Sequence, residues 1–98
     1  MPLAIRKGDI CKGHADWPPR PNDEGSPDVF INGLAAHRVG DHWVTHCNST
    51  PECHDSIAAT GSPNVFVNRK ALCRENDLVA CGSLMGSTKS LNVYVNGK

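Results

Sequence analysis

Three side chains of the types that bind transition metals recur at nearly the same position in three related segments of this 98-residue chain. Each segment contains an Arg-x-x-Asp sequence, and the potential ligand follows the aspartate by five, five and four residues. The three pairs of aspartate and potential ligand are Asp9 with His14, Asp41 with His46, and Asp77 with Cys81. Because repeated segments can be related by an axis, a pseudo-threefold arrangement would bring these ligands together. The spacing therefore predicts one shared metal site.

A fourth ligand is expected from an insert between the repeats. Structural zinc sites are tetrahedral and are closed by four imidazole or thiolate ligands. His54 is the best choice, because it lies eight residues after His46 and leaves enough chain to loop back onto the same ion. Cys47 and Cys53 compete for this place. The predicted Zn²⁺ ligands are His14, His46, His54 and Cys81, with imidazoles that must be neutral, which requires a pH above about 6.

The remaining histidines and the aspartates support catalysis less well. His37 and His42 lack the repeated offset and are expected on the surface. A thiol beside an imidazole can act as a nucleophile, and Asp41, Asp55 or Asp77 could orient the imidazole. However, one structural role explains all the repeated aspartates, since a carboxylate just after Gly or Asn can cap a turn by accepting backbone N–H bonds. No enzymatic activity is expected.

The elements that position these residues are short strands followed by tight turns. Three runs of β-branched and aromatic residues, each followed by Asn-Gly or Asn-Arg, are Val29-Phe30-Ile31, Val65-Phe66-Val67 and Val93-Tyr94-Val95. Asn and Gly tolerate the positive φ of hairpin turns. A Gly-Ser pair precedes each run, at Gly25-Ser26, Gly61-Ser62 and, more loosely, Gly86-Ser87. The pattern predicts a mostly β single domain, 1–98, of three pseudo-threefold strand-turn repeats.

Alternation along these strands predicts two faces. The valines and isoleucine are expected on one face, and Phe30, Phe66 and Tyr94 on the other.

Composition narrows the class of function. Ten basic and ten acidic residues cancel, so no broad positive field favours nucleic acid as a partner. With 39% hydrophobic and 5% aromatic residues, a large apolar core is not expected, and a metal would help to hold the fold. The chain has no apolar run long enough to span a bilayer and no signal-peptide pattern. We expect it to be made in the cytoplasm and exported by another route.

Five cysteines cannot all pair within one chain. Cys47 and Cys53 could close a small loop, but a cytosolic origin favours free thiols, so thiols are the expectation. Cys11 aligns with Trp43 and Val79, and Cys73 aligns with Ile5 and His37. These positions are mostly apolar, so Cys11 and Cys73 are expected to be buried thiols.

The repeats also resemble a known family. Gly33-Leu34-Ala35-Ala36-His37-Arg38-Val39-Gly40-Asp41 is similar to the signature Gly-x-Pro-Ala-Ala-Arg-Val-Gly-Asp of the PAAR-repeat family. Segments Leu3-Ala4-Ile5-Arg6 and Ala71-Leu72-Cys73-Arg74 stand where Pro-Ala-Ala-Arg would be in the other two repeats. The arginine is kept in all three, and the likeness extends over nearly the whole chain.

The resemblance implies a fold and a mechanical role. PAAR proteins are small cones on the blunt end of a trimeric β-helical spike, in type VI secretion systems or contractile phage tails. A zinc ion near the apex is held by three His and one Cys, which by position are the same four residues. The implied function is a tip, one per trimer, that helps to breach a target membrane, in some members with effectors. Because this sequence stops at Lys98, directly after the third strand-turn unit, we expect no effector extension.

Two other classes remain open from the sequence. A free zinc-binding regulatory or interaction module would present a basic patch or a peptide groove. A small metal-dependent hydrolase would need an open coordination position, which four protein ligands would close.

Overall fold

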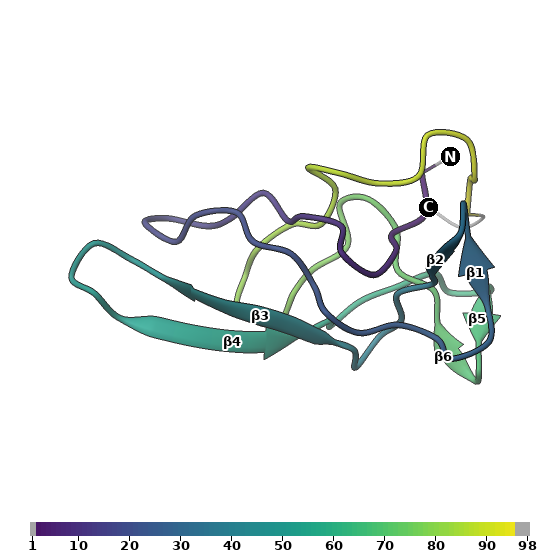
Figure 1. The fold of residues 1–98 in the computed structure, drawn as a ribbon, viewed down its shortest axis with the longest axis horizontal. Helices are drawn as coiled ribbons and strands as arrows, with labels where there is room; N and C mark the ends of the chain where they lie inside the picture. The colour runs from purple at the N-terminus through teal and green to yellow at the C-terminus, as the bar shows by residue number, and fades with distance from the viewer. Residues whose placement is uncertain (1, 96–98) are drawn as a thin grey trace.

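The computed structural model describes residues 2–95 and contains six short strands and no helix in this range (Figure 1). The strands are β1 Phe30–Ile31, β2 Leu34–Ala35, β3 His42–Cys47, β4 Cys53–Ile57, β5 Phe66–Val67 and β6 Lys70–Ala71. They form three antiparallel pairs, β1–β2, β3–β4 and β5–β6. The predicted mostly β fold is confirmed. Within the described residues, nothing has the combination of helical length and apolar character needed to cross a bilayer.

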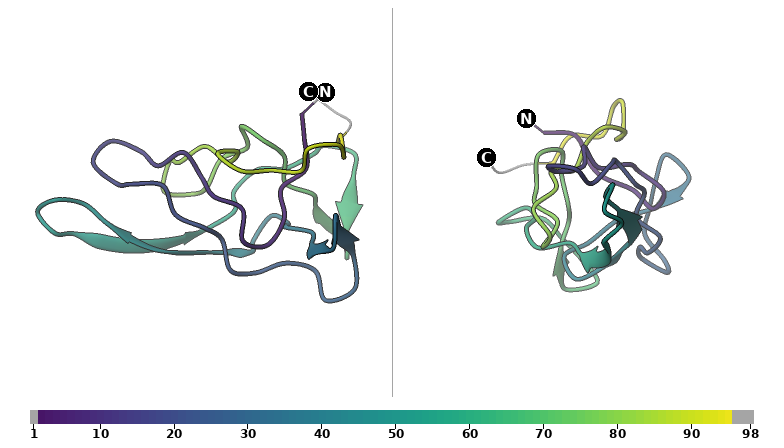
Figure 2. Two further views of the ribbon diagram at one scale, coloured as in Figure 1. Left: turned by 45° about the horizontal axis from the view of Figure 1, so that its top comes forward. Right: turned by 90° about the vertical axis from the view of Figure 1, so that its left-hand side faces the viewer.

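The molecule is elongated, with extents of 39 × 25 × 21 Å. The two small hairpins β1–β2 and β5–β6 lie at the broad end, which we call the base (Figure 1). The loop of residues 11–21 and the turn between β3 and β4 lie at the narrow end, which we call the apex (Figures 1 and 2). The long β3–β4 hairpin therefore connects the apex to the body of the molecule.

The hairpins of the base form where the sequence predicts them. Ile31 pairs with Leu34, which leaves a two-residue turn of Asn32 at φ 54° and Gly33 at φ 80°. Positive φ at both central residues is the geometry that matches the twist of flanking strands. The β5–β6 turn repeats this geometry, although its second central residue is an arginine rather than a glycine.

The third unit is completed by the beginning of the chain. Tyr94 pairs with Leu3, the amide of Ala4 donates to the carbonyl of Val93 at 2.9 Å, and the amide of Val95 donates to the carbonyl of Pro2 at 2.8 Å. The two ends of the chain thus share one repeat. The turn predicted at Asn96-Gly97 lies outside the described residues.

A serine before each strand holds the backbone that leads into it. The hydroxyls of Ser26, Ser62 and Ser90 accept bonds from the amides two and three residues later, at 2.9–3.3 Å. In the third unit this serine is Ser90, so the sequence alignment on Gly86-Ser87 was wrong. The third unit reads Lys89-Ser90-Leu91-Asn92 and lacks the Gly and Pro that mark the other two.

A closed ring of backbone hydrogen bonds lies on the pseudo-threefold axis. The amide of Ile5 donates to Cys73 at 3.1 Å, that of Cys73 to His37 at 3.0 Å, and that of His37 to Ile5 at 3.1 Å. All three residues are fully buried. Burial confirms the expectation for Cys73, and it raises the pKa of the Cys73 thiol well above its ordinary value. For His37 the expectation of a surface position was wrong, because the ring places it on the axis.

The three Arg-x-x-Asp sequences form the same turn. In each, the aspartate carboxylate accepts a hydrogen bond from the arginine's backbone N–H at 2.7–2.9 Å. The same carboxylate accepts two further bonds from the arginine's Nε and Nη2 at 2.9–3.1 Å. The residue before the aspartate has positive φ, at Gly8, Gly40 and Asn76. The predicted turn-capping role of the aspartates is confirmed, with the ion pair as an added function.

Two apolar clusters fill the space on either side of the ring. One contains Cys11, Trp43 and Val79, the three residues that the repeats align, all buried. The other, beneath the base, contains Ile31, Val67 and Val95. The predicted inner face is confirmed except at Val29, which is 37% exposed.

Candidate metal centre

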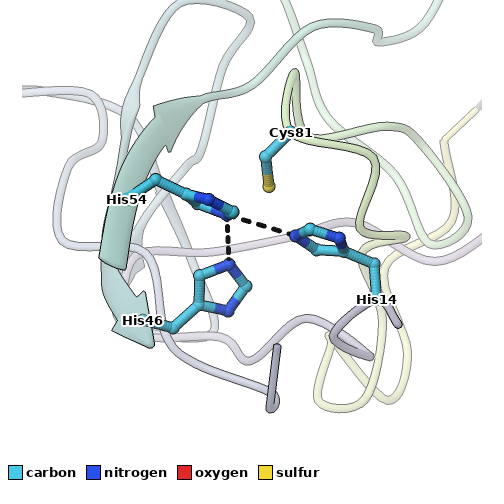
Figure 3. Close-up of side chains that lie close together, drawn as sticks. All are labelled: His14, His46, His54 and Cys81. Atoms are coloured by element: carbon cyan, nitrogen blue, oxygen red, sulfur yellow. Dashed lines mark hydrogen bonds between the residues drawn. The ribbon is translucent and has the colours of Figure 1, made fainter. Parts of the chain in front are cut away.

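Four side chains from three separate segments meet near the apex (Figure 3). His46 on β3 faces His54 on β4 as a directly paired couple in the strand register. His14 comes from the first loop, where it pairs with Trp17, and Cys81 comes from the turn after Val79. The structure therefore brings together the three residues singled out by the repeats and the one chosen from the insert.

The candidate ligand atoms lie close together, at separations on the scale of those around a single metal ion. The Nε2 atom of His54 lies 2.7 Å from that of His46 and 3.2 Å from that of His14. All four ligand atoms, including Cys81 Sγ, lie within 4.8 Å of one another. Zn–N bonds of about 2.0–2.1 Å imply nitrogen atoms about 3.4 Å apart. This group could hold a metal ion.

Hydrogen bonding prepares His46 to act as a ligand. Its Nδ1 lies 2.7 Å from the carbonyl oxygen of Pro18, which can only accept a bond. The proton must therefore sit on Nδ1, which leaves the Nε2 lone pair pointing at the group. Burial lowers the pKa of His46, and it also lowers the pKa of His14. Both pKa shifts favour the neutral imidazole, which is the form that can bind a metal.

Arg20 stabilises the thiolate form of Cys81, and the sequence analysis missed it. The buried guanidinium lies 3.5 Å from the sulfur of Cys81 and 3.2 Å from that of Cys11, and it is anchored on the carbonyl of Val44 at 2.6 Å. Burial acts to raise the pKa of Cys81, but hydrogen bonds from Ser83 and Arg20 outweigh it, and the pKa is lowered. Arg20 belongs to the proline-rich insert, so no repeat pointed to it.

Trp17 covers two of the imidazoles. Its ring stacks on His14 at 5.0 Å and on His54 at 4.8 Å between centroids. The indole therefore limits the access of water to this side of the group.

Comparison with known proteins agrees with this geometry. The model of the PAAR motif matches residues 12–87. This chain belongs to the PAAR family. It is 34% identical over 62 residues to the double-stranded DNA deaminase toxin A of Burkholderia cenocepacia. The matched region covers 63% of this chain and 4% of the toxin. It is 31% identical over 78 residues to an NAD(P)(+) glycohydrolase toxin of Pseudomonas aeruginosa. This matched region covers 74% of the chain and 18% of the toxin.

A (p)ppApp synthetase toxin of Pseudomonas aeruginosa matches with the same identity and coverage. The PAAR chain thus spans less than a fifth of the length of these curated relatives. The PAAR motif is a structural module and not a catalytic one, so the likeness to these toxins assigns no enzymatic activity to the matched region.

Two cysteines of the PAAR chain depart from expectation. Cys47 and Cys53 form a disulfide across the β3–β4 hairpin, with an S–S distance of 2.05 Å. The expectation of free thiols was wrong, because the strand register places the two residues directly opposite each other, which sequence spacing alone does not reveal. Their sulfurs are bonded to each other, so neither competes with His54 as a ligand.

His42 lies outside the metal group, as expected, but its imidazole is held by two carboxylates. Its Nδ1 lies 2.7 Å from Asp23 and its Nε2 lies 2.8 Å from Asp55. The hydrogen bond with Asp55, followed by that with Asp23, raises the pKa of His42. This histidine therefore favours the charged form, whereas His14 and His46 favour the neutral one.

Proposed function

We propose that this PAAR chain is the zinc-stapled tip that caps the trimeric β-helical spike of a contractile injection system and helps it to pierce a target membrane. The observation that carries the proposal is the base. Three exposed aromatic rings occupy equivalent positions in its three units: Phe30, Phe66 and Tyr94, at 60%, 59% and 59% exposure. Exposed apolar surface that gathers at one end of a soluble protein marks an interaction site.

A threefold partner fits this surface. One chain with three approximate copies of a surface can contact all three subunits of a trimer around their common axis. A second copy on the same axis is excluded by geometry, so one tip per trimer is expected. Apolar neighbours of the rings extend the surface, since Leu34 and Leu91 are also exposed. Because the contact is mainly apolar and the net charge is zero, its affinity should depend weakly on salt.

Zinc fits the four donors of the apex better than a harder cation. Three imidazole nitrogens and one thiolate are the ligands that zinc prefers, whereas Mg²⁺ and Ca²⁺ take oxygen. One thiolate and three neutral imidazoles with Zn²⁺ would leave a net charge of +1. Four protein ligands would leave no coordination position for water, which supports a structural ion rather than a hydrolytic one.

The relatives support delivery by a secretion system. Type VI secretion is the setting that the PAAR match favours, and the toxin names of the relatives support a module that travels outward with effectors. We propose that this chain is made in the cytoplasm, is assembled on the spike and contacts the target membrane briefly.

The decisive experiment is a measurement of stoichiometry. Purified tip is mixed with trimeric β-helical spike fragments, and the mass of the complex is measured by light scattering. The proposal expects three spike chains with one tip. Three tips per trimer, or no complex with several candidate spikes at micromolar concentration, would overturn it.

A further inference from the structure

We propose that the Cys47–Cys53 disulfide is a redox-sensitive clasp that controls how firmly the apex holds its metal. The inference rests on the metal role proposed above and goes beyond it. In the oxidised form the clasp keeps two ligands in place, and in the reduced form the metal is released faster. The argument concerns four neighbouring positions of one hairpin: His46, Cys47, Cys53 and His54.

The clasp and the ligands occupy adjacent rungs of the same two-stranded ladder. His46 pairs with His54, and the next pair along the strands is Cys47 with Cys53. The Cα atoms of the two cysteines are 4.1 Å apart. A covalent bond at this rung therefore sets the separation of the two strands one residue away from two of the four ligands.

Apart from the disulfide, the two strands are joined here by a short stretch of backbone pairing that ends at the bond from the amide of Asn48 to the carbonyl of Glu52 at 2.9 Å. Toward the body of the molecule, the register shifts between Trp43 and His46, so regular pairing is interrupted just before the ligand pair. Toward the tip, the turn is held by hydrogen bonds of Asn48 with Thr50 and Glu52, all in exposed surroundings. Only two paired rungs lie between the irregularity and the turn, and the disulfide ties one of them. Its loss would leave the separation of the ligand pair to backbone pairing, to the contact of His46 with the carbonyl of Pro18 and to the stacking of Trp17 on His54.

The sulfur atoms are placed where a reductant can reach them. Both cysteines are exposed, in contrast with the fully buried Cys11 and Cys73. A dithiol reductant would supply two electrons and two protons by thiol–disulfide exchange. The S–S bond breaks to give two thiols, while the reductant's two thiols become its own disulfide. All four metal ligands stay in the chain, so the change acts on their positions and not on their number.

The experiment measures how fast metal leaves the protein. The full chain is loaded with Zn²⁺, and its transfer to a coloured chelator in excess is followed with and without a phosphine reductant. We expect reduction to accelerate release by about tenfold, the scale on which groups that orient metal ligands act. Alkylation followed by mass spectrometry confirms the number of free thiols in each sample.

A variant separates the clasp from other effects of the reductant. Cys47→Ser/Cys53→Ser keeps all four ligands and should release zinc at the fast rate with or without reductant. Equal rates for the oxidised and reduced wild type, slower release on reduction, or alkylation of both cysteines in the oxidised protein would overturn the clasp while leaving the metal centre in place. Absence of bound zinc in the oxidised protein would overturn both proposals.

Discussion

In the repeated body of the molecule the same contacts are made three times around one axis, whereas at the apex each contact is made once. The ring at Ile5, His37 and Cys73 uses only backbone groups, so three chemically different side chains occupy equivalent places. The apex instead depends on the identity of single side chains that converge on one point. Backbone bonding places no demand on the side chain, whereas the positions at the apex carry only side chains that can bind metal, here His14, His46 and Cys81.

The fourth candidate ligand explains how a threefold repeat can contribute to a group of four side chains. A tetrahedron has a threefold axis through each corner, so three repeats can supply three equivalent ligands and an insert can supply the fourth. His14, His46 and Cys81 come from the repeats, and His54 comes from the strand that follows the inserted turn. The repeats therefore bring three candidate ligands together, and the insert supplies the fourth.

The largest effect is expected from a change in one of the three repeated Arg-x-x-Asp turns. Asp41 is fully buried against Arg38, so Asp41→Ala leaves a buried charge without its partner. We expect a loss of about 3–5 kcal/mol in the free energy of unfolding, measured by urea denaturation of the zinc-loaded protein. The matched variant Asp9→Ala should cost less, because the Arg6 side chain is 15% exposed against 7% for Arg38. Equal losses would contradict an effect of burial.

Metal removal tests the apex. Chelation should lower the melting temperature by at least about 10 °C, since ion binding adds stability to the folded state alone. Hydrogen exchange would show where the structure loosens after metal removal. Amides of β3 and β4 should lose protection from exchange, while the amides of Ile5, His37 and Cys73 should keep theirs. His46→Ala/Cys81→Ser should behave like the chelated protein. An unchanged melting temperature would show that the metal does not hold the fold.

Spike binding tests whether the base acts as three equal surfaces. Each of Phe30→Ser, Phe66→Ser and Tyr94→Ser should weaken binding to the trimer by about 1–3 kcal/mol, and by similar amounts. Titration calorimetry gives the three affinities. Ile57→Ser is the control, because Ile57 is an exposed apolar residue, 48% accessible, on β4 rather than at the base. A large loss in only one aromatic variant would contradict threefold docking.

The smallest effect concerns His42, whose folded-state pKa is raised. A raised pKa stabilises the fold below the unfolded value of about 6.5, and this contribution is lost as the pH rises through the folded value. Because the side chain is 38% exposed, we expect His42→Asn to cost no more than about 0.5 kcal/mol at pH 6 and less at pH 9. Urea denaturation at both pH values measures this difference. A greater loss at pH 9 would contradict the assigned charge state.

Local patterns were sufficient for the repeating parts of the fold. Asn32 and Asn68 marked the hairpin turns, because positive φ restricts the residues that can stand there. The alternation of Ile31 and Val67 with Phe30 and Phe66 marked two opposite faces, because strand side chains alternate, and the structure shows that the face of Ile31 and Val67 is the buried one. Nearly equal offsets from the aspartates, of five, five and four residues, singled out three of the four residues that converge.

The sequence by itself determined the repeats, the turns and the group of side chains that meets at the apex. Only the tertiary structure decided the pairing of Cys47 with Cys53, the position of Arg20 beside Cys81, the burial of His37 and the closure of the third unit by Leu3. Turns and alternation follow from the conformational preferences of neighbouring residues, which a sequence displays directly. Cross-strand register and contacts between distant segments depend on how the chain closes around its axis, and no local pattern encodes that closure.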